Sequence, residues 1–338
     1  MNIGILGAGS WAIALSVLLE GRGHDVRMWE FNSNDADMLA QRREHPAKLP
    51  GIIIPDNVLI TNSLTRALDG AELVLCVVPS QTMRKAMRNV VATVDPAIIK
   101  NVRGWLIASK GIECETLRLM SDVLLEEIPG ITEDKLVILS GPSHAEEVSR
   151  NIPTTVVAAS HNYALAVEVQ QAFSTNSFRV YTNNDVIGVE LAASVKNVIA
   201  LAAGICDGMG FGDNTKGAVL TRGMVEIIRL GKKMGAKEET FYGLAGMGDL
   251  ITTCISKHSR NRNMGEMIAS GLSLKDALAK MVMVAEGVET AKSAYRLSQK
   301  YGIEMPITSE VYKALFEGKA PKDAARDLMT RESKPERW

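Results

Sequence analysis

The sequence predicts an α/β domain with a doubly wound sheet, followed by an all-helical domain. In the first half, short apolar segments alternate with amphipathic stretches, as strands and helices do in βαβ units. After about residue 185 the strand signals stop, and helical patterns fill the rest of the chain. The 338 residues are enough for two separate cores. We therefore expect one domain over residues 1–188 and a second over residues 189–338.

The first half contains a series of strand-like segments. Each is a short run of apolar and β-branched residues, and helical stretches separate most of them. The expected strands are residues 2–6, 25–29, 58–60, 72–78, 105–109, 135–139, 154–159 and 178–181. The expected helices are residues 10–20, 35–43, 80–91, 117–127 and 164–173. Because parallel strands need long crossover connections, this order favours a parallel sheet.

The second half reads as helices throughout, and the first of them carries an unusual lysine. The expected helices are residues 186–205, 217–234, 262–270, 273–280, 289–301 and 308–317. In the first helix, Leu191, Val195 and Ile199 belong to one apolar stripe, and Lys196 lies off that stripe among alanines. A lysine ringed by small residues can be covered by another surface, and burial lowers its pKa. On position alone, a surface lysine on the helix flank is the more frequent case.

Composition excludes several classes of function. A formal net charge of −1 provides no broad electrostatic field for nucleic acid or an acidic membrane surface. The four cysteines are far apart without a C-x-x-C pair, which suits a reducing compartment. No cleavable signal precedes the first strand, and no apolar run approaches the roughly 20 residues of a membrane span. We expect a soluble cytoplasmic protein.

A glycine motif follows the first expected strand. Gly7-Ala-Gly9-Ser-Trp-Ala12 matches the G-x-G-x-x-G/A pattern at the start of a βαβ unit. Gly7 permits a tight turn, Gly9 lets the backbone approach a pyrophosphate, and Ala12 is small enough for the helix to pack on the sheet. The helix N-terminus supplies N–H donors for phosphates. The motif predicts a dinucleotide-binding domain of the Rossmann type.

The residue at the end of the second strand bears on the choice of cofactor. Glu30 stands where an acidic residue bonds the ribose 2′-OH of NAD and repels the 2′-phosphate of NADP. This favours NAD, with NADP possible. The alternative is that Glu30 is a solvated loop acid.

Polar residues follow two later strands of the expected sheet. Lys110 comes directly after residues 105–109, and Ser140-Gly141-Pro-Ser143 follows residues 135–139. Loops at the carboxyl ends of parallel strands form the ligand crevice of such sheets. Gly141 and Ser143 can offer backbone and hydroxyl donors there, although a turn with an N-cap explains Ser143 almost as well.

A second polar cluster lies in the helical half. Asp249 precedes Ser259-Arg260-Asn261 by ten residues, and Ser259 can cap the helix that follows. An arginine beside free N–H groups suits a phosphate monoester. The alternative is a loop arginine paired with an acid such as Asp249. The histidines show no metal-site spacing, and no nucleophile–histidine pair stands out.

Taken together, these segments resemble the nicotinamide-dependent glycerol-3-phosphate dehydrogenase family over nearly the whole chain. No single segment suffices, but the ordered set is specific. The matching stretches are Gly7 to Trp11, Leu49-Pro-Gly51, Ser109-Lys-Gly111, Ser140 to Glu146, Lys196-Asn197, Gly204 to Lys216, Gly248-Asp249, Ser259 to Asn261 and Glu286-Gly287.

The resemblance implies the reversible reduction of dihydroxyacetone phosphate to sn-glycerol 3-phosphate with NAD(P)(H), which feeds glycerophospholipid synthesis. It makes Lys196 the general acid/base. It implies a substrate site formed by Lys110, Gly141, Ser143, Lys196, Asp249, Ser259, Arg260 and Asn261. It implies a cofactor site formed by Gly7, Gly9, Ser10, Trp11, Glu30, Lys110, Ala145, Arg260, Val284 and Glu286. It also suggests a homodimer, and nothing in the scheme requires a metal.

Two departures and two alternatives accompany this interpretation. The family usually has glycine at the position of Ala12, and many bacterial relatives carry a basic residue where this chain has Glu30-Phe31. The first alternative is a β-hydroxyacid dehydrogenase relative, which would bind a carboxylate in place of the phosphate. The second is a non-catalytic dinucleotide sensor, against which the presence of both Lys110 and Lys196 argues.

Overall fold

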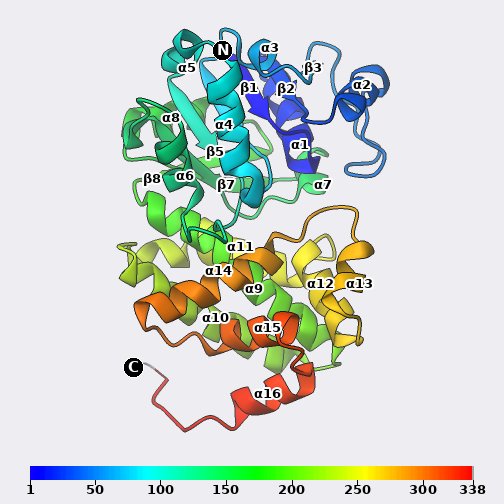
Figure 1. The fold of residues 1–338 in the computed structure, drawn as a ribbon, viewed down its shortest axis with the longest axis vertical. Coiled ribbons are helices and arrows are strands. Elements are labelled where there is room, and N and C mark those ends of the chain that lie inside the picture. Colours follow the sequence, from blue (N-terminus) through cyan, green and yellow to red (C-terminus); the bar gives the residue numbers. More distant parts are fainter. Residues whose placement is uncertain (337–338) are drawn as a thin grey trace.

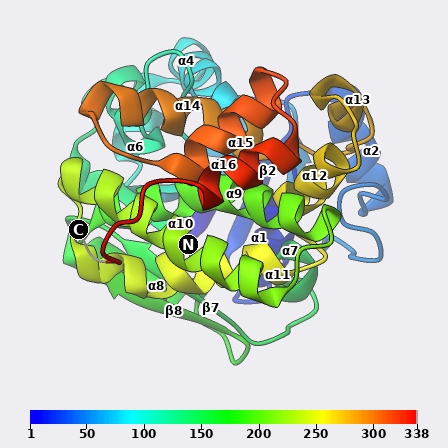
Figure 2. The same cartoon turned by 90° about the horizontal axis from the view of Figure 1, so that it is seen from below.

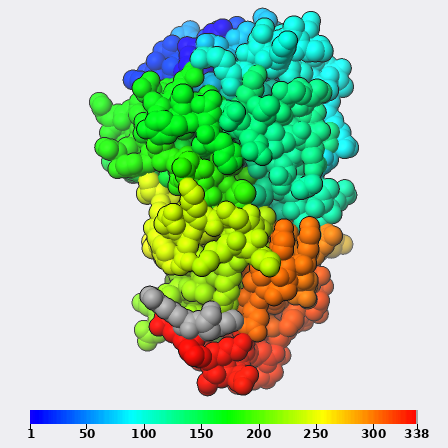
Figure 3. Space-filling view, turned by 90° about the vertical axis from the view of Figure 1, so that its left-hand side faces the viewer, coloured from blue at the N-terminus to red at the C-terminus, as the bar shows by residue number. Residues whose placement is uncertain are grey.

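The structure is a computed structural model that describes residues 1–336. An α/β half lies above a helical half in Figure 1, and the space-filling view shows the two halves stacked end to end (Figure 3). The chain completes the sheet before it enters the helical half, since the last strand ends at Asn183. This arrangement confirms the predicted fold class.

One eight-stranded sheet runs through the α/β half in the order β3-β2-β1-β4-β5-β6-β7-β8. The strands are β1 (Asn2–Leu6), β2 (Asp25–Trp29), β3 (Leu59–Thr61), β4 (Leu73–Cys76), β5 (Gly104–Ile107), β6 (Leu136–Ser140), β7 (Thr154–Ala159) and β8 (Phe178–Asn183). All eight were expected, with boundaries that differ by at most two residues. The central strands β4, β5 and β6 are buried on both faces, which explains their continuous apolar runs.

Helices cover both faces of this sheet. The first face carries α1 (Ser10–Glu20), α2 (Ser33–Arg42), α7 (Ala145–Val148) and α8 (Tyr163–Phe173). The opposite face carries α3 (Leu64–Leu68), α4 (Met83–Thr93), α5 (Pro96–Asn101) and α6 (Met120–Glu127). The short helices α3, α5 and α7 were not expected, because they are only four to six residues long and have little periodicity.

The sheet departs from the expected parallel order at one place. β7 runs antiparallel to β6, with Ser140 opposite Val157, whereas the other neighbouring pairs are parallel. The β6–β7 connection contains only the one-turn helix α7, which is too short for a crossover. The carboxyl end of β7 therefore lies at the opposite edge of the sheet from the carboxyl end of β6.

The helical half is built around α9 (Val186–Gly208), as seen from below in Figure 2. The surrounding helices are α10 (Asp213–Lys233), α11 (Asp249–Ile255), α12 (Arg260–Ala269), α13 (Leu274–Ala279), α14 (Glu286–Tyr301), α15 (Pro306–Phe316) and α16 (Pro321–Met329). Helices α11 and α16 were not expected. Because helices pack on α9 from several sides, nearly every α9 residue is buried, and the predicted distinction between an apolar stripe and a flank is wrong.

Glycines let α9 and α12 pack closely. A Cβ at Gly204 would lie 1.9 Å from the Arg262 carbonyl oxygen, and one at Gly265 would lie 2.2 Å from the Leu201 carbonyl oxygen. Gly208 also faces α12, so three glycines bring the two backbones together. The beginning of the glycine-dense stretch 204–217 therefore serves helix packing.

Among residues 1–336, α9 alone is long and apolar enough by composition to cross a membrane, and 94% of its apolar window is buried inside the protein. Its hydropathy accordingly reflects its place as a core helix.

Candidate active site

The candidate site lies where the carboxyl ends of the strands meet the helical half. Lys110 follows β5 and Gly141 follows β6, so the sheet order brings them to one edge. From the other side, α9 contributes Lys196 and the first residue of α11 is Asp249. Four segments that are distant in the sequence thus converge.

A single carboxylate joins the two lysines. Asp249 Oδ1 lies 2.7 Å from Lys196 Nζ, and its Oδ2 lies 2.7 Å from Lys110 Nζ. Lys196 is 4% exposed and Asp249 is 2% exposed. Lys110 comes from the α/β half while Lys196 and Asp249 come from the helical half, so the Lys110–Asp249 ion pair also joins the two halves.

Burial and charge set the protonation of these groups. Burial lowers the pKa of Lys196 to about 8, and the charge of Asp249 opposes this decrease while that of Lys110 adds to it. Burial alone would raise the pKa of Asp249, but attraction to Lys110 and Lys196 holds it below its usual range. The site therefore keeps an ionised carboxylate beside a lysine that can exchange its proton near neutral pH.

The turn after β6 supports Lys110. The Lys110 ammonium donates to the Gly141 carbonyl oxygen at 3.2 Å, and the Ser143 hydroxyl donates to the same oxygen at 3.0 Å. Gly141 has φ +144°, and a Cβ there would lie 2.9 Å from the Val156 Cα. Only glycine fits this position, so the turn brings its backbone close to both the lysine and β7.

The predicted serine–arginine–asparagine cluster opens α12. Ser259 Oγ accepts from the Arg262 N–H at 3.2 Å as the N-cap, as expected from the sequence. Asn261 donates to the Asn197 side chain at 2.9 Å, and its amide oxygen accepts from the Gly287 N–H at 2.9 Å. These bonds connect the starts of α12 and α14 to the α9 residue next to Lys196.

Among the described residues, Asp249 pairs with the two lysines and not with Arg260, in contrast to the alternative in which Arg260 and Asp249 pair. The Arg260 guanidinium donates to the Val284 carbonyl oxygen at 3.0 Å. Val284 precedes α14 and is exposed, so these two expected cofactor residues lie together.

The β1–α1 turn fits a dinucleotide. Gly7 has φ +117° and its N–H donates to the Trp29 carbonyl at 2.9 Å, which joins the ends of β1 and β2. A Cβ at Gly9 would meet nothing within 4 Å, so the backbone there faces open space. Gly9 caps α1 without a side-chain hydrogen bond, and the first N–H groups of α1, from Ser10 and Trp11, remain available for phosphate oxygens.

Glu286 connects the start of α14 to the α/β half. Its carboxylate accepts from the Ser80 hydroxyl at 2.5 Å and from the Ser80 N–H at 3.1 Å. Burial raises the pKa of Glu286, and the bonds from Ser80 oppose this. A Cβ at Gly111, the residue after Lys110, would collide with the same serine, so Glu286 and Lys110 lie on neighbouring segments.

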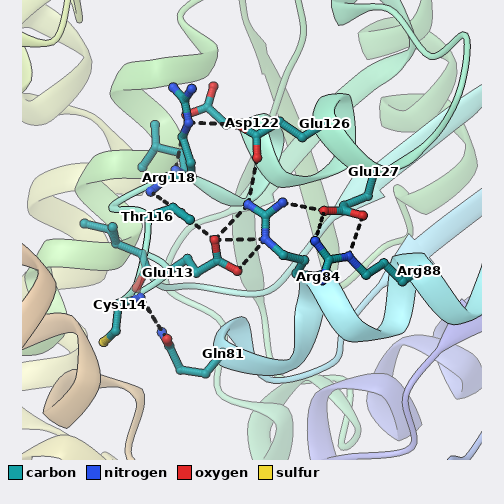
Figure 4. A network of polar contacts seen from close by, with 12 residues as sticks. Gln81, Arg84, Arg88, Glu113, Cys114, Thr116, Arg118, Asp122, Glu126 and Glu127 are labelled. Atoms are coloured by element: carbon teal, nitrogen blue, oxygen red, sulfur yellow. Dashed lines mark hydrogen bonds and ion pairs between the residues drawn. The ribbon is translucent and has the colours of Figure 1, made fainter.

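The loop that carries Lys110 is fixed from both sides. Figure 4 shows Arg84 of α4 bound to Glu113, Glu126 and Glu127, with Nη2 2.8 Å from the Glu113 carboxylate. Gln81 donates to the Ile112 carbonyl at 2.9 Å. From the helical half, the Ser194 hydroxyl of α9 donates to the Gly111 carbonyl at 3.2 Å and that of Ser293 in α14 donates to Ile112 at 3.0 Å.

Many of the expected site residues contact one another in the structure, but not all of them do. Direct hydrogen bonds or ion pairs connect Lys110 with Gly141 and Asp249, Asp249 with Lys196, and Arg260 with Val284. Ala145 begins α7, which packs against α1. Glu30 makes none of these contacts: its carboxylate accepts from the Asn32 N–H at 3.0 Å.

Sequence reasoning missed three residues of the site. The Thr253 hydroxyl accepts from the Lys196 ammonium and donates to the Asp249 carboxylate, and Thr253 lies one turn after Asp249 in α11. The i, i+4 spacing is a signal for this contact, but α11 itself was not expected. Asn197 was quoted without a role, and Ser80 was not considered. Within residues 1–336, no group of three histidine, cysteine or acidic side chains is arranged to hold a metal ion.

Comparison with known proteins gives the same assignment along the whole chain. Residues 2–166 match the family model described as NAD-dependent glycerol-3-phosphate dehydrogenase N-terminus, and residues 185–326 match the model for its C-terminus. Among curated proteins, the glycerol-3-phosphate dehydrogenase [NAD(P)+] of Pelodictyon phaeoclathratiforme is 49% identical over 100% of both chains. That of Chlorobium limicola is 50% identical over 99% of both.

A solved structure supports this assignment. The glycerol-3-phosphate dehydrogenase of Coxiella burnetii superimposes with a TM-score of 0.92, at 36% identity, over 98% of this chain and 99% of the other. The fold, the site and these similarities agree. The chain belongs to the NAD-dependent glycerol-3-phosphate dehydrogenase family and is an NAD(P)-dependent oxidoreductase that interconverts dihydroxyacetone phosphate and glycerol 3-phosphate.

Proposed function

We propose that Lys196 is the general acid/base of this reaction and that Asp249 and Lys110 hold it in place. The observation that carries the proposal is the buried carboxylate bridge, in which Asp249 lies 2.7 Å from each lysine nitrogen. A lysine with a pKa of about 8 donates a proton to a developing alkoxide and retrieves it in the reverse direction. Its positive charge also stabilises the alkoxide before the proton moves.

The cofactor site consists of the residues expected from the sequence. These are Gly7, Gly9, Ser10, Trp11, Lys110, Ala145, Arg260, Val284 and Glu286, with Glu30 at the ribose end. The uncapped start of α1 and the open space at Gly9 support this assignment. When bound, the nicotinamide supplies the hydride for reduction of the ketone and accepts it in the reverse reaction.

The substrate site follows from the cluster at the start of α12. Ser259, Arg260 and Asn261 provide cationic and N–H donors for the phosphate, and Gly141 and Ser143 contribute from the opposite half. Asn197 and Thr253 join this set because they contact Asn261 and Lys196 respectively. Binding between two halves orients the ketone oxygen toward Lys196 and excludes water from it.

For the cofactor, we propose a preference for NAD over NADP. Glu30 provides a carboxylate at the carboxyl end of β2, where a 2′-phosphate would be repelled. Lys85 provides the competing charge, since its ammonium lies 5.7 Å from the centre of the exposed Phe31 ring. Comparing the rates with NADH and NADPH at equal concentration shows whether the Glu30 carboxylate or the Lys85 ammonium governs the cofactor preference.

We further propose that the first domain ends near residue 188, that the enzyme is a cytoplasmic homodimer, and that its product feeds glycerophospholipid synthesis. The end of the sheet at Asn183 supports the first point.

The experiment follows cofactor absorbance with dihydroxyacetone phosphate in the wild type and in Lys196→Ala. We expect the variant to lose at least ~10²-fold in kcat, because the proton donor is absent, while its affinity for NADH stays unchanged. Lys232→Ala is the matched control, since Lys232 is an exposed lysine of α10. Near-normal turnover of Lys196→Ala would refute the role of Lys196, and a strong NADPH preference would refute that of Glu30.

A further inference from the structure

His144 carries a buried nitrogen that the reaction scheme above does not use. It follows Ser143 in the turn after β6 and is the N-cap residue of α7, yet its side chain makes no cap bond. Within the part of the chain that the structure describes, its Nε2 is buried and has no hydrogen-bond partner. Burial of a polar atom without a partner costs free energy, so such an atom in a native protein calls for an explanation.

The surroundings of His144 are those of the active site. Ser143, the residue before His144, donates to the Gly141 carbonyl oxygen at 3.0 Å, and Lys110 donates to the same oxygen at 3.2 Å. Lys110 is one of the two lysines of the carboxylate bridge. The unpartnered nitrogen therefore lies close to the groups that we assign to proton transfer, on the α/β side of the junction.

A second histidine contacts His144 from the helical half. The ring centres of His144 and His258 are 5.9 Å apart, with an angle of 53° between the ring planes. His258 directly precedes Ser259, the first residue of the cluster that we assign to the substrate phosphate. The pair thus spans the junction between the carboxylate bridge and the phosphate cluster.

The chemistry of the site favours a neutral ring. Burial lowers the pKa of His144, and the ammonium of Lys196 lowers it further. A neutral imidazole offers one N–H donor and one acceptor, and it adds no charge next to two lysines. In the tautomer that protonates Nε2, the buried N–H is a donor that lacks an acceptor within the described residues, and an anionic or hydroxylated ligand can supply one.

We propose that His144 binds the substrate, with its Nε2–H donating a hydrogen bond to an oxygen of the three-carbon phosphate ester. His258 acts as a positioning residue that holds the His144 ring from the opposite half. The proposal rests on the function proposed above, since it requires the substrate to lie between the carboxylate bridge and the start of α12.

Two substitutions separate a binding role from a packing role. His144→Phe keeps a ring of similar size but has no donor, whereas His144→Gln keeps an N–H at a similar reach. Because a hydrogen bond to a charged ligand is lost, we expect His144→Phe to raise the KM for dihydroxyacetone phosphate about tenfold or more. The KM for NADH and the Tm should stay at wild-type values, and His144→Gln should restore the substrate KM to within about threefold.

His161→Phe is the matched control. His161 follows β7, so it lies at the edge of the sheet opposite the turn that carries His144. A substrate KM of His144→Phe within about twofold of wild type would overturn the proposal. Equal impairment of both His144 variants together with a lowered Tm would overturn it as well, because that result indicates packing alone. Wild-type turnover in the same assay tests the proposed function independently.

A spectroscopic measurement tests the contact directly. The chain has five histidines, so the ¹⁵N spectrum of a histidine-labelled sample is simple, and the His144→Phe variant identifies the His144 signals. Glycerol 3-phosphate added to the wild type should shift the Nε2 resonance of His144. The absence of a shift at a saturating concentration would contradict a bond at this nitrogen.

Discussion

Lys196 and Asp249 depend on each other for their charge states. Lys196 is almost fully buried, and its pKa of about 8 is the balance between burial, which lowers it, and Asp249, which raises it. In the proposed mechanism, reduction of the ketone needs the protonated amine of Lys196, so the wild-type rate should fall as pH rises through about 8. The oxidation of glycerol 3-phosphate needs the neutral amine and should rise over the same range.

Asp249→Asn should move this pH dependence. The substitution removes the charge that raises the pKa of Lys196, so the decline in the reduction rate should begin at a pH below 8. It also frees Lys110, and kcat should fall by about 10²-fold or more. The measurement is kcat from pH 6 to 10, with Asp134→Asn in the exposed segment before β6 as the control. An unchanged position of the decline would contradict the electrostatic role of Asp249.

For single residues, the sequence predicts which side chains can take part in the reaction better than it predicts which side chains they contact. The alanines around Lys196 indicate that the amine can be covered, but the covering carboxylate comes from a residue 53 positions later. That pairing depends on the packing of α11 against α9, which no local pattern encodes. The unpartnered nitrogen of His144 could not be predicted from the sequence either, because the absence of a hydrogen-bond partner is a property of the folded site.

Among the contacts between secondary-structure elements, the close packing of α9 on α12 has the largest effect on the geometry of the site. Gly204 touches the Arg262 backbone, and Arg260 and Asn261 lie in the same first turn of α12. The distance between these two helices therefore sets the distance between Lys196 and the proposed phosphate donors.

Gly204→Ala should separate the two helices. The new Cβ would lie 1.9 Å from a backbone oxygen, which cannot rotate away. We expect a loss of about 1–3 kcal/mol in the free energy of unfolding, and a raised KM for the phosphate substrate. Urea unfolding and steady-state kinetics measure the two effects. Gly217→Ala in α10 is the control, since a Cβ there meets nothing within 4 Å and a helical alanine is favoured. Equal stability of both variants would contradict this account.

Element types were more predictable than element directions. The strands were found because their apolar runs are short and bounded by turns, as in residues 154–159. The reversed direction of β7 was not found, because it depends on the length of the helix in the connection before it. α9 was predicted as a helix, but its burial on all sides follows from neighbours that come later in the chain.

At the scale of the whole molecule, a buried glutamate connects the two halves. Glu190 of α9 accepts from the Ser121 N–H at 3.0 Å and from the Ser121 hydroxyl at 2.5 Å, at the start of α6. Burial raises the pKa of Glu190 from 4.5 to about 7, although both bonds from Ser121 oppose this. The folded protein therefore binds a proton here more tightly than the unfolded chain does.

This difference in pKa makes stability depend on pH. Between pH 4.5 and 7 the folded state holds the proton that the unfolded state releases, so stability from this group is present at low pH and is lost as pH rises through about 7. The full loss is on the order of 3 kcal/mol. Glu190→Gln keeps the geometry, since its amide can accept from the Ser121 N–H and donate to the hydroxyl.

We therefore expect the wild type to lose stability relative to Glu190→Gln between pH 5 and pH 8, as measured by urea unfolding at both values. Glu226, whose buried carboxyl also has a pKa of about 7, titrates in both proteins and cancels from the difference. Identical pH dependence in the two proteins would show that Glu190 ionises equally well in the folded and unfolded states.

The burial of α9 has a consequence for how the protein is made. This 23-residue apolar helix is synthesised before α10 to α14, which cover much of it. At roughly 5 to 20 residues per second, synthesis of the chain from Gly208 to Tyr301 takes roughly 5 to 20 s. During that time the helix that will carry Lys196 has only its partners in the α/β half, such as Ser121 and Gly111. The face that the later helices will cover presents nascent-chain chaperones and the membrane-insertion machinery with a hydrophobic segment of spanning length.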